Sequence, residues 1–230
     1  MAGFTGAPPI VTDGLVFAVD AANKDSYPGS GTTWKDLSGN GNDGTLINGP
    51  TFNSANGGSI VFDGSDDYVV FPHDSTLNVD SITVEMICSF DSFFNGYGVA
   101  KRFSYAIDNA FFLGLGSDTL IRWSHSTNGT TQLNLDYTHS MNTTDIYHIV
   151  GTYDAAGGKN LYIDAQEVAS NNDSGNLYQS SDDLYIGADG RLATGFNTMD
   201  NFFVLRIYDR SLSSTEISQN YNALKGRFNL

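Results

Sequence analysis

The chain contains very little glutamate. Glu occurs three times in 230 residues, at positions 85, 167 and 216. Because Glu favours helices and the composition instead offers 25 Gly, 15 Phe and 12 Tyr, strands joined by tight turns are expected. Hydrophobic residues make up 40% of the chain, which is enough for a substantial core and excludes a disordered protein.

Cysteine is nearly absent as well. Cys88 is the only one, which excludes an intrachain disulfide. In the strand expected over residues 82–90 it shares a face with Ile82, Val84 and Met86. We therefore expect a buried core thiol and not a nucleophile.

Long apolar runs are missing. No stretch of 18 apolar residues occurs, which argues against a transmembrane helix, and residues 1–10 lack the charged start and apolar centre of a secretory signal. Synthesis in a cytoplasm is therefore expected. A protein that folds inside a host cell and is released by lysis, as virion components are, would combine these features.

Positive charge is scarce. There are 11 Lys and Arg against 26 Asp and Glu, for a formal net charge of −15. Such a surface repels phosphate backbones and anionic lipids, so binding to nucleic acid or to a membrane surface is disfavoured, and no membrane insertion is expected. The acidic excess is mostly Asp in turns, explained by solvation, as in marine or halophilic surroundings, or by affinity for calcium. We favour solvation.

The chain does contain a regular series of short apolar segments separated by Gly, Asn or Asp. They recur about every ten residues, which is typical of an antiparallel sandwich and not of alternating strands and helices. The segments are residues 14–20, 59–62, 68–71, 82–90, 98–103, 110–115, 119–124, 131–136, 146–153, 160–164, 166–169, 183–187 and 202–208.

These segments form one unit. Residues 1–13, which include Pro8-Pro9, are expected to form an extended arm, and residues 14–230 a single domain. Asp63-Gly64 predicts a hairpin between the two segments on either side of it.

One helix is predicted near the C-terminal end. Ser213 and Glu216 have the spacing of a capping box. Ile217 and Leu224 then fall on one face, and Gly226 predicts the end of the helix. We expect this helix to close one end of the sandwich.

Several motifs in a fixed order carry a family likeness. They are WKDLSGNGNDGTL (residues 34–46), GSIVFDGSDDYVV (58–70), YHIVGTYD (147–154) and DNFFVLRIYDRSLS (200–213). Together they resemble the LamG-like branch of the concanavalin A-like lectin/glucanase family. The resemblance implies an all-β, two-sheet antiparallel jelly-roll sandwich with a short C-terminal helix.

The last motif departs from the family pattern, because an extra residue stands between Asp200 and Val204, and we expect a β-bulge there. A narrower likeness is carried by residues 10–23, 26–34 and 221–228, which are similar to LamG-like structural proteins of tailed bacteriophages, marine ones especially. This resemblance implies a virion protein that contacts capsid or tail proteins.

No catalytic motif accompanies the resemblance. Hydrolases of this fold use two carboxylates from one strand, and here no two glutamates are close in sequence. Glu85 is expected to be exposed or on the concave face, and His148 to pack or form hydrogen bonds. No serine lies in a Gly-x-Ser-x-Gly elbow. We predict that the protein is not an enzyme.

Calcium is the metal that the resemblance suggests. Residues 105–112, YAIDNAFF, resemble the Asp-Asn ligand pair of pentraxins, which implies a Ca²⁺ site at Asp108 and Asn109. An ordinary turn explains Asp-Asn equally well, and we favour that explanation. Residues 36–43 are rich in Asp and Asn but lack the final glutamate of an EF-hand loop.

Aromatic residues predict a surface for a ligand or partner. Phe93, Phe94 and Tyr97 form an apolar loop tip, and Trp123 with His125 could offer a ring to a sugar. The alternatives are that Trp123 points into the core and that the loop tip is a subunit interface.

The sequence therefore predicts a non-enzymatic virion structural or decoration protein of a tailed phage, oligomeric and acting by adhesion. The alternative is a lectin-like receptor-binding module, assisted by calcium, that recognises polysaccharide on a host surface. A glycan hydrolase is the third possibility and lacks its motif.

Overall fold

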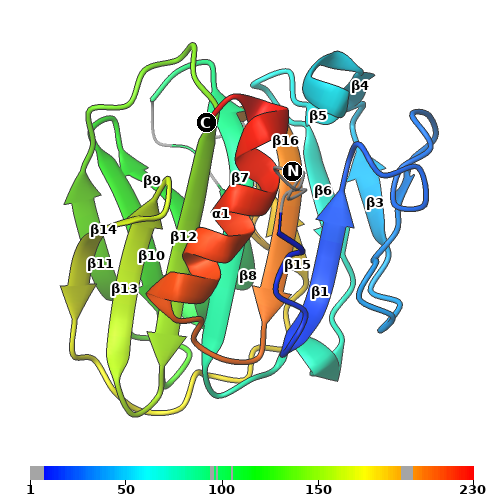
Figure 1. Cartoon of the computed structure of the whole chain (residues 1–230). Helices are drawn as coiled ribbons and strands as arrows, with labels where there is room; N and C mark the ends of the chain where they lie inside the picture. The colour runs from blue at the N-terminus through cyan, green and yellow to red at the C-terminus, as the bar shows by residue number, and fades with distance from the viewer. Residues whose placement is uncertain (1–7, 94–95, 97, 105, 193–198) are drawn as a thin grey trace, which may run out of the picture.

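The computed structural model describes residues 8–93, 96, 98–104, 106–192 and 199–230. These residues form a pair of antiparallel sheets that pack face to face, and a helix lies across the outer face of one sheet (Figure 1). The all-β sandwich expected from the sequence is confirmed. No helix among the described residues is both long and apolar enough to cross a membrane.

The strands agree with the predicted segments, and short strands also form near Trp34, Leu46 and Phe52. Their bounds are β1 (Leu15–Asp20), β2 (Thr33–Trp34), β3 (Gly44–Ile47), β4 (Thr51–Asn53), β5 (Ser59–Val61), β6 (Tyr68–Phe71), β7 (Ile82–Phe90), β8 (Val99–Ser104), β9 (Ile107–Ser117), β10 (Leu120–His125), β11 (Leu133–Thr138), β12 (Tyr147–Asp154), β13 (Gly158–Ile163), β14 (Gln166–Asn171), β15 (Leu184–Ile186) and β16 (Met199–Tyr208).

The first sheet, sheet A, has the strand order β14-β13-β12-β7-β16-β5-β4, and β1 also pairs with β16. The register of β16 against β7 shifts on either side of Phe202, which confirms the predicted bulge. On its other side β16 serves two partners. Residues 204–208 pair with β1, and Asn201 and Phe202 pair with β5.

The second sheet, sheet B, has the order β11-β10-β9-β8-β15-β6-β3-β2. The predicted hairpin between β5 and β6 is wrong, since β5 belongs to sheet A and β6 to sheet B. The turn that contains Asp63-Gly64 therefore carries the chain from one sheet to the other. Both flanking strands keep the alternation of a hairpin because each has one face in the common core.

The core between the sheets is rich in aromatic side chains. Phe17 packs edge-on against Phe71, with ring centroids 4.9 Å apart. Trp123 lies against the backbone of Gly151, where a Cβ atom would be 2.5 Å from the indole. Glycine is thus required in this strand of sheet A by the indole that projects from sheet B. Cys88 belongs to the same core, as predicted.

The helix, α1 (Ser214–Phe228), begins with the predicted capping box: the Glu216 amide donates to Ser213 Oγ, and Glu216 Oε2 accepts from the Ser213 amide. It does not end at Gly226 but continues to Phe228, where Asn229 adopts the left-handed conformation that caps it.

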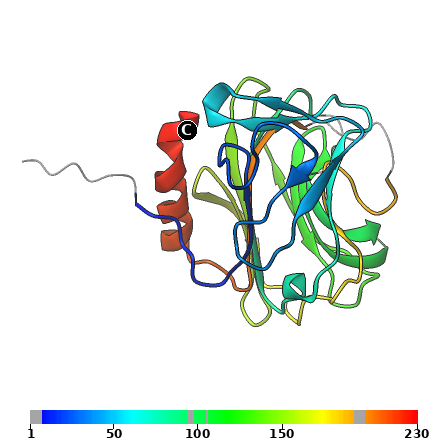
Figure 2. The same cartoon turned by 90° about the vertical axis from the view of Figure 1, so that its right-hand side faces the viewer.

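The position of α1 also differs from the prediction. Instead of closing an end of the sandwich, it lies across the outer face of sheet A (Figures 1 and 2). Ile217 packs in a cluster with residues of β12, β13 and β16, and Leu224 and Phe228 pack against β7 and β16. The arm that precedes β1 is held to the helix, since the Val11 amide donates to Asn220 Oδ1 at 2.8 Å.

Candidate functional site

The structure turns Trp123 and His125 of β10 into the core. Both side chains are fully buried. Trp123 Nε1 donates to the carbonyl of Thr152 at 2.9 Å, and the His125 ring lies 3.8 Å from the ring of Tyr153. The expectation that these rings are open to a sugar is wrong, and the alternative, an inward-pointing Trp123, describes the structure.

His125 takes part in a polar link between the two sheets. The buried ammonium of Lys159, on β13 of sheet A, lies 3.3 Å from His125 Nδ1 and 3.0 Å from a carboxylate oxygen of Asp173, and donates to the Leu133 carbonyl at 2.6 Å. Burial, and then the charge of Lys159, lowers the pKa of His125 to about 4. His125 is therefore neutral near pH 7 and serves as a structural group.

Of the predicted aromatic loop tip, Phe94 and Tyr97 lie outside the described residues. Phe93 is half-buried, with its ring centroid 5.6 Å from that of Phe90 and 4.6 Å from that of His139. Phe93 thus packs against the sandwich, and its neighbour His139 lines the cavity described below.

In the Asp-Asn pair on β9, the carboxylate of Asp108 already forms hydrogen bonds within the protein. Asp108 has a φ of 47°, and its carboxylate accepts from the amide and the hydroxyl of Ser181. Asn109 is fully buried. The two side chains thus have different surroundings, one half-exposed and one in the interior.

A lysine supplies positive charge near Asp108. The fully buried ammonium of Lys101 donates to the carbonyls of Ser180 (2.7 Å) and Asp182 (2.9 Å) and lies 3.1 Å from His73 Nδ1. Burial lowers the pKa of Lys101 to about 8, and the charges of Asp108 and two neighbouring aspartates oppose this. Two carbonyl oxygens and a histidine nitrogen suit an ammonium better than Ca²⁺, which takes about six to eight oxygens. Calcium at Asp108 and Asn109 stays a prediction.

Glu85, expected to be exposed or on the concave face, is buried beneath α1. Its Oε1 lies 2.7 Å from His148 Nε2, and its Oε2 accepts from Asn220 Nδ2 at 2.9 Å and lies 3.5 Å from Arg206. Burial would raise the pKa of Glu85, but the charge of Arg206 and the contacts with His148 together hold it below its ordinary value. A carboxylate in this position cannot reach a polysaccharide.

The side chains in the middle of the outer face of sheet B are buried. Phe112, Ala100 and Tyr185 are neighbours across β9, β8 and β15, and all three are buried. The Arg102 guanidinium lies over the Phe112 ring, 4.2 Å from its centroid. No aromatic face among these residues is available for stacking, so an accessible site must lie elsewhere.

An accessible site begins where β11 and β14, the edge strands of the two sheets, approach each other, and extends past the start of β12 to residues 228–230. Two cavities, of about 290 Å³ and 410 Å³, share the lining residues Asp145, Tyr147 and Asp164. The smaller is also lined by Tyr137, His139, Ser140, Met141, Asn142, Ile163 and Val168, and the larger by Thr144, Ile146, Phe228, Asn229 and Leu230. We call the combined space the Tyr147 cleft.

Asn142 organises one wall of the Tyr147 cleft. Its Oδ1 accepts from the amides of Thr144 (2.9 Å) and Asp145 (3.0 Å), and its Nδ2 donates to Asp145 Oδ2 at 2.7 Å. The Asn142 amide donates to the hydroxyl of Tyr147 at 2.7 Å. A single side chain and its backbone therefore fix both the Asp145 carboxylate and the Tyr147 hydroxyl.

The opposite wall is the β13–β14 turn. Asp164 and Ala165 both have positive φ, 49° and 62°, as in the tight turns that suit hairpins. The Asp164 amide donates to the His148 carbonyl at 2.8 Å, and Asp164 Oδ1 accepts from the His148 amide at 3.0 Å. Burial raises the pKa of this half-buried carboxyl. The orientation of the Asp164 carboxylate is fixed by hydrogen bonds to the backbone of His148 and not by a flexible side chain.

His139 lines the smaller cavity with a neutral ring. Its Nδ1 accepts from the Met141 amide at 3.2 Å, so in the neutral ring Nε2 carries the proton. Nε2 is buried and has no hydrogen-bond partner among the described residues. Burial also lowers the pKa of His139, which favours the neutral ring.

The cleft thus combines the half-buried ring of Tyr137, carboxylate acceptors and a side-chain amide, which suits a site for a polar organic ligand such as a sugar. Sequence reasoning missed it, because its residues come from β11, a loop, β12 and a turn with no shared spacing.

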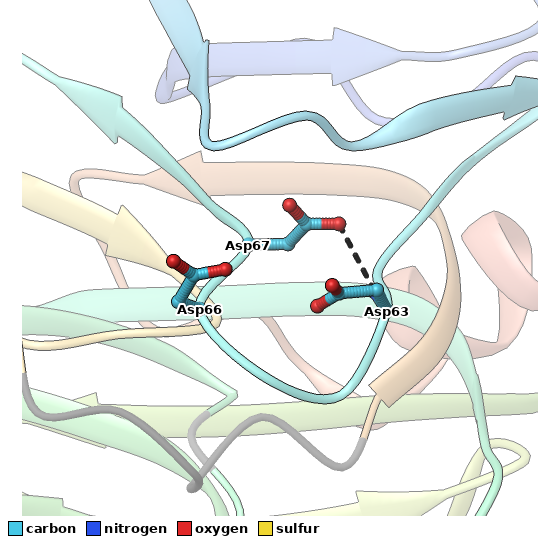
Figure 3. A group of neighbouring side chains, drawn as sticks. All are labelled: Asp63, Asp66 and Asp67. Atoms are coloured by element: carbon cyan, nitrogen blue, oxygen red, sulfur yellow. Dashed lines mark hydrogen bonds between the residues drawn. The ribbon is translucent and has the colours of Figure 1, made fainter.

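A separate acidic cluster lies in the turn between β5 and β6. Asp63, Asp66 and Asp67 bring their oxygens within 4.8 Å of one another, and Asp67 Oδ2 accepts from the Asp63 amide at 3.0 Å (Figure 3). Burial, and then the charges of its two neighbours, raises the pKa of Asp67. Within the described stretches of the chain no other group of three or more His, Cys, Asp or Glu lies this close. The hydrogen bond between Asp63 and Asp67 stabilises the turn that carries the chain from sheet A to sheet B.

Comparison with known proteins places the fold. Residues 63–218 match the family model described as the concanavalin A-like lectin/glucanases superfamily. No curated protein sequence matches the chain.

Similar solved structures are binding domains of clostridial toxins. The binding domain of Paraclostridial Mosquitocidal Protein 1 has a TM-score of 0.71 and 15% identity over 92% of this chain and 52% of its own. The binding domain of botulinum neurotoxin serotype D/C VPI 5993 gives 0.72 and 12%, over 93% and 53%. That of botulinum neurotoxin DC in complex with SialylT gives 0.69 and 12%, over 93% and 52%. The chain thus spans about half the length of these domains, and the likeness is one of fold.

Proposed function

The chain belongs to the concanavalin A-like lectin/glucanases superfamily, and we propose that it is a non-enzymatic carbohydrate-binding module whose ligand lies in the Tyr147 cleft. The observation that carries this proposal is the lining of the cleft. Tyr137, which is half-buried, supplies aromatic surface, while Asp145, Asp164 and Asn142 supply acceptors and donors for sugar hydroxyls. The similar solved structures are binding domains, which is in keeping with this role.

A binding role fits the cleft better than hydrolysis does. General acid catalysis needs a carboxylic acid that keeps its proton near pH 7, usually in an apolar pocket. Here Asp145 is exposed and accepts from Asn142, and Asp164 accepts from a backbone amide. Burial raises the pKa of Asp164, but its exposed neighbour Asp145 shows that the cleft is not an enclosed apolar pocket of that kind. We expect no release of reducing ends from any polysaccharide.

Glycan-array screening followed by calorimetry tests this function, with the cleft variant Tyr137→Ala and the control Tyr68→Ala, which changes a half-buried tyrosine on sheet B outside the cleft. We expect the wild-type protein to bind a specific glycan, Tyr137→Ala to lose about tenfold in affinity, and Tyr68→Ala to keep it. Running each assay with calcium and with chelator shows whether binding needs the metal. Absence of binding to every glycan, or equal losses in both variants, would overturn the proposal.

We further propose that this module is a virion structural or decoration protein of a tailed phage, as the narrower sequence resemblance suggests. The observation that favours protein contacts is an apolar tip beside the β8–β9 hairpin. Phe103, Ile107 and Leu192 are 44%, 57% and 46% exposed, and the turn at Gly190 bonds to the Arg102 carbonyl of β8. Large apolar side chains this exposed suit a subunit interface.

Light scattering tests the contact role. We expect the wild-type protein to form an oligomer and the Ile107→Ser variant to shift towards monomer, while Leu37→Ser, at another exposed leucine, leaves the oligomer intact. Mass spectrometry of purified phage particles tests the virion location directly. A monomeric wild-type protein would remove the support for the interface.

A further inference from the structure

The charged side chains that line the Tyr147 cleft are all acidic. Asp145 and Asp164 line both of its cavities, and no lysine or arginine is among the lining residues. The remaining titratable base, His139, has a lowered pKa and is neutral near pH 7. The whole chain has a formal net charge of −15, so distant charges on average strengthen the negative potential at the cleft.

The two carboxylates can still accept hydrogen bonds from a ligand. Asp164 uses Oδ1 for the His148 amide, and its Oδ2 makes no hydrogen bond to any described residue. Asp145 accepts from Asn142 through Oδ2 and is exposed, so solvent-facing lone pairs remain. Because both carboxylates are held by protein bonds, a cationic donor would meet acceptors that are already oriented.

The two carboxylates should discriminate between sugars according to the charge that each sugar carries. A carboxylated or sulfated sugar would have to place its anion beside two aspartates in a cleft without a compensating cation. A sugar with an ammonium group would gain a charge-assisted hydrogen bond and keep a ring face for Tyr137. Neutral sugars would bind through hydroxyls alone, without the ionic contribution.

We propose that the Tyr147 cleft selects glycans built from amino sugars with free, protonated amines, such as glucosamine, over N-acetylated and anionic glycans. This inference rests on the carbohydrate-binding function proposed above and names its ligand class. Asp145 and Asp164 are its specificity-determining residues.

Calorimetry with defined oligosaccharides tests the selection. The probes are a β-1,4-linked glucosamine tetramer, its fully N-acetylated form, sialyllactose and a lysine tetrapeptide, each at 50 and 500 mM NaCl. We expect the glucosamine tetramer to bind about tenfold more tightly than the acetylated form at low salt, with a smaller preference at high salt. Asp145→Asn should weaken binding of the glucosamine tetramer about 3- to 10-fold and leave the acetylated form unchanged.

Asp25→Asn is the matched control, since Asp25 is exposed and does not line the cleft. Equal binding of both tetramers would overturn the selection and leave carbohydrate binding intact. Failure of all sugars would remove both proposals. Tight binding of the lysine peptide would show recognition of cations and not of sugars, and an Asp25→Asn effect equal to that of Asp145→Asn would reduce the selection to net charge; either result overturns the inference.

Discussion

Nε2 of His148 lies 2.7 Å from Oε1 of Glu85, and both side chains are fully buried between sheet A and helix α1. The other Glu85 oxygen accepts from Asn220 of the helix, which also donates to the hydroxyl of Tyr208. Arg206 lies 3.5 Å from the same carboxylate. Sheet A thus forms a charged and hydrogen-bonded platform of Glu85, Arg206 and Tyr208, which binds Asn220 of the helix. The helix is thereby fixed by polar contacts as well as by apolar packing.

Replacement of Glu85 by Gln should destabilise the fold severely. The variant leaves the buried guanidinium of Arg206 without its carboxylate, and breaking a buried pair in this way costs about 3–5 kcal/mol. Urea denaturation followed by circular dichroism measures the loss. Glu167→Gln, at an exposed glutamate, should change the free energy of unfolding by less than about 0.5 kcal/mol. A similar small effect at Glu85 would contradict this account of the platform.

Acid should weaken the fold through Glu216 as well as Glu85. The hydrogen bonds from Arg210 lower the pKa of Glu216 from 4.5 to about 2. Because the folded pKa is depressed, the stabilisation is complete above the unfolded pKa and is lost as the pH falls from about 4.5 towards 2. Melting temperatures measured between pH 6 and pH 2 should fall more steeply for the wild-type protein than for Glu216→Gln. Parallel curves would show that this pair contributes nothing.

Mild alkali should have the opposite effect through Lys101. Its folded pKa of about 8 lies below the ordinary lysine value of 10.5, so between these values the unfolded chain holds more protons than the folded one. The free energy of unfolding from this group therefore rises with pH across that window. Urea titrations at pH 7.5 and pH 9.5 measure the slope, which should flatten in Lys101→Met. An unchanged slope would mean that the lysine does not titrate there.

The Cys88 thiol should be inert in the native protein. It is fully buried, and burial raises its pKa. A thiol without solvent access and without thiolate character reacts slowly with disulfide reagents. We expect no reaction with Ellman's reagent in buffer and one equivalent in concentrated urea. Rapid reaction in buffer would reveal opening of sheet A around β7.

Local patterns predicted the strands, the bulge and the helix start because each depends on neighbours in sequence. Asp63-Gly64 shows the limit of such patterns: a tight turn between two alternating segments indicates a hairpin, yet here it joins two sheets. Glu85 shows another limit. Alternation indicated a surface position, but the outer face of sheet A is covered by a helix more than 120 residues further along the chain.

The candidate site was harder to predict for a similar reason. The Tyr147 cleft depends on where β11 and β14 approach each other and on the hydrogen bonds of Asn142, and neither leaves a mark in the spacing of residues. The motif-based prediction placed Trp123 and His125 correctly on a strand, but wrongly on the side of that strand that faces solvent. Strands with bulky residues on both faces do not reveal which one meets solvent.

The central place of β16 in sheet A bears on how the protein is made. This strand, residues 199–208, lies between β7 on one side and β1 and β5 on the other. During synthesis β1 and β5 are therefore made well before β16, the strand with which they pair. Such long-range pairing slows folding and leaves strand edges exposed on the ribosome. Sheet A therefore cannot be completed before residues 199–208 have been synthesised, and nascent chains that lack β16 should depend on chaperones to remain soluble.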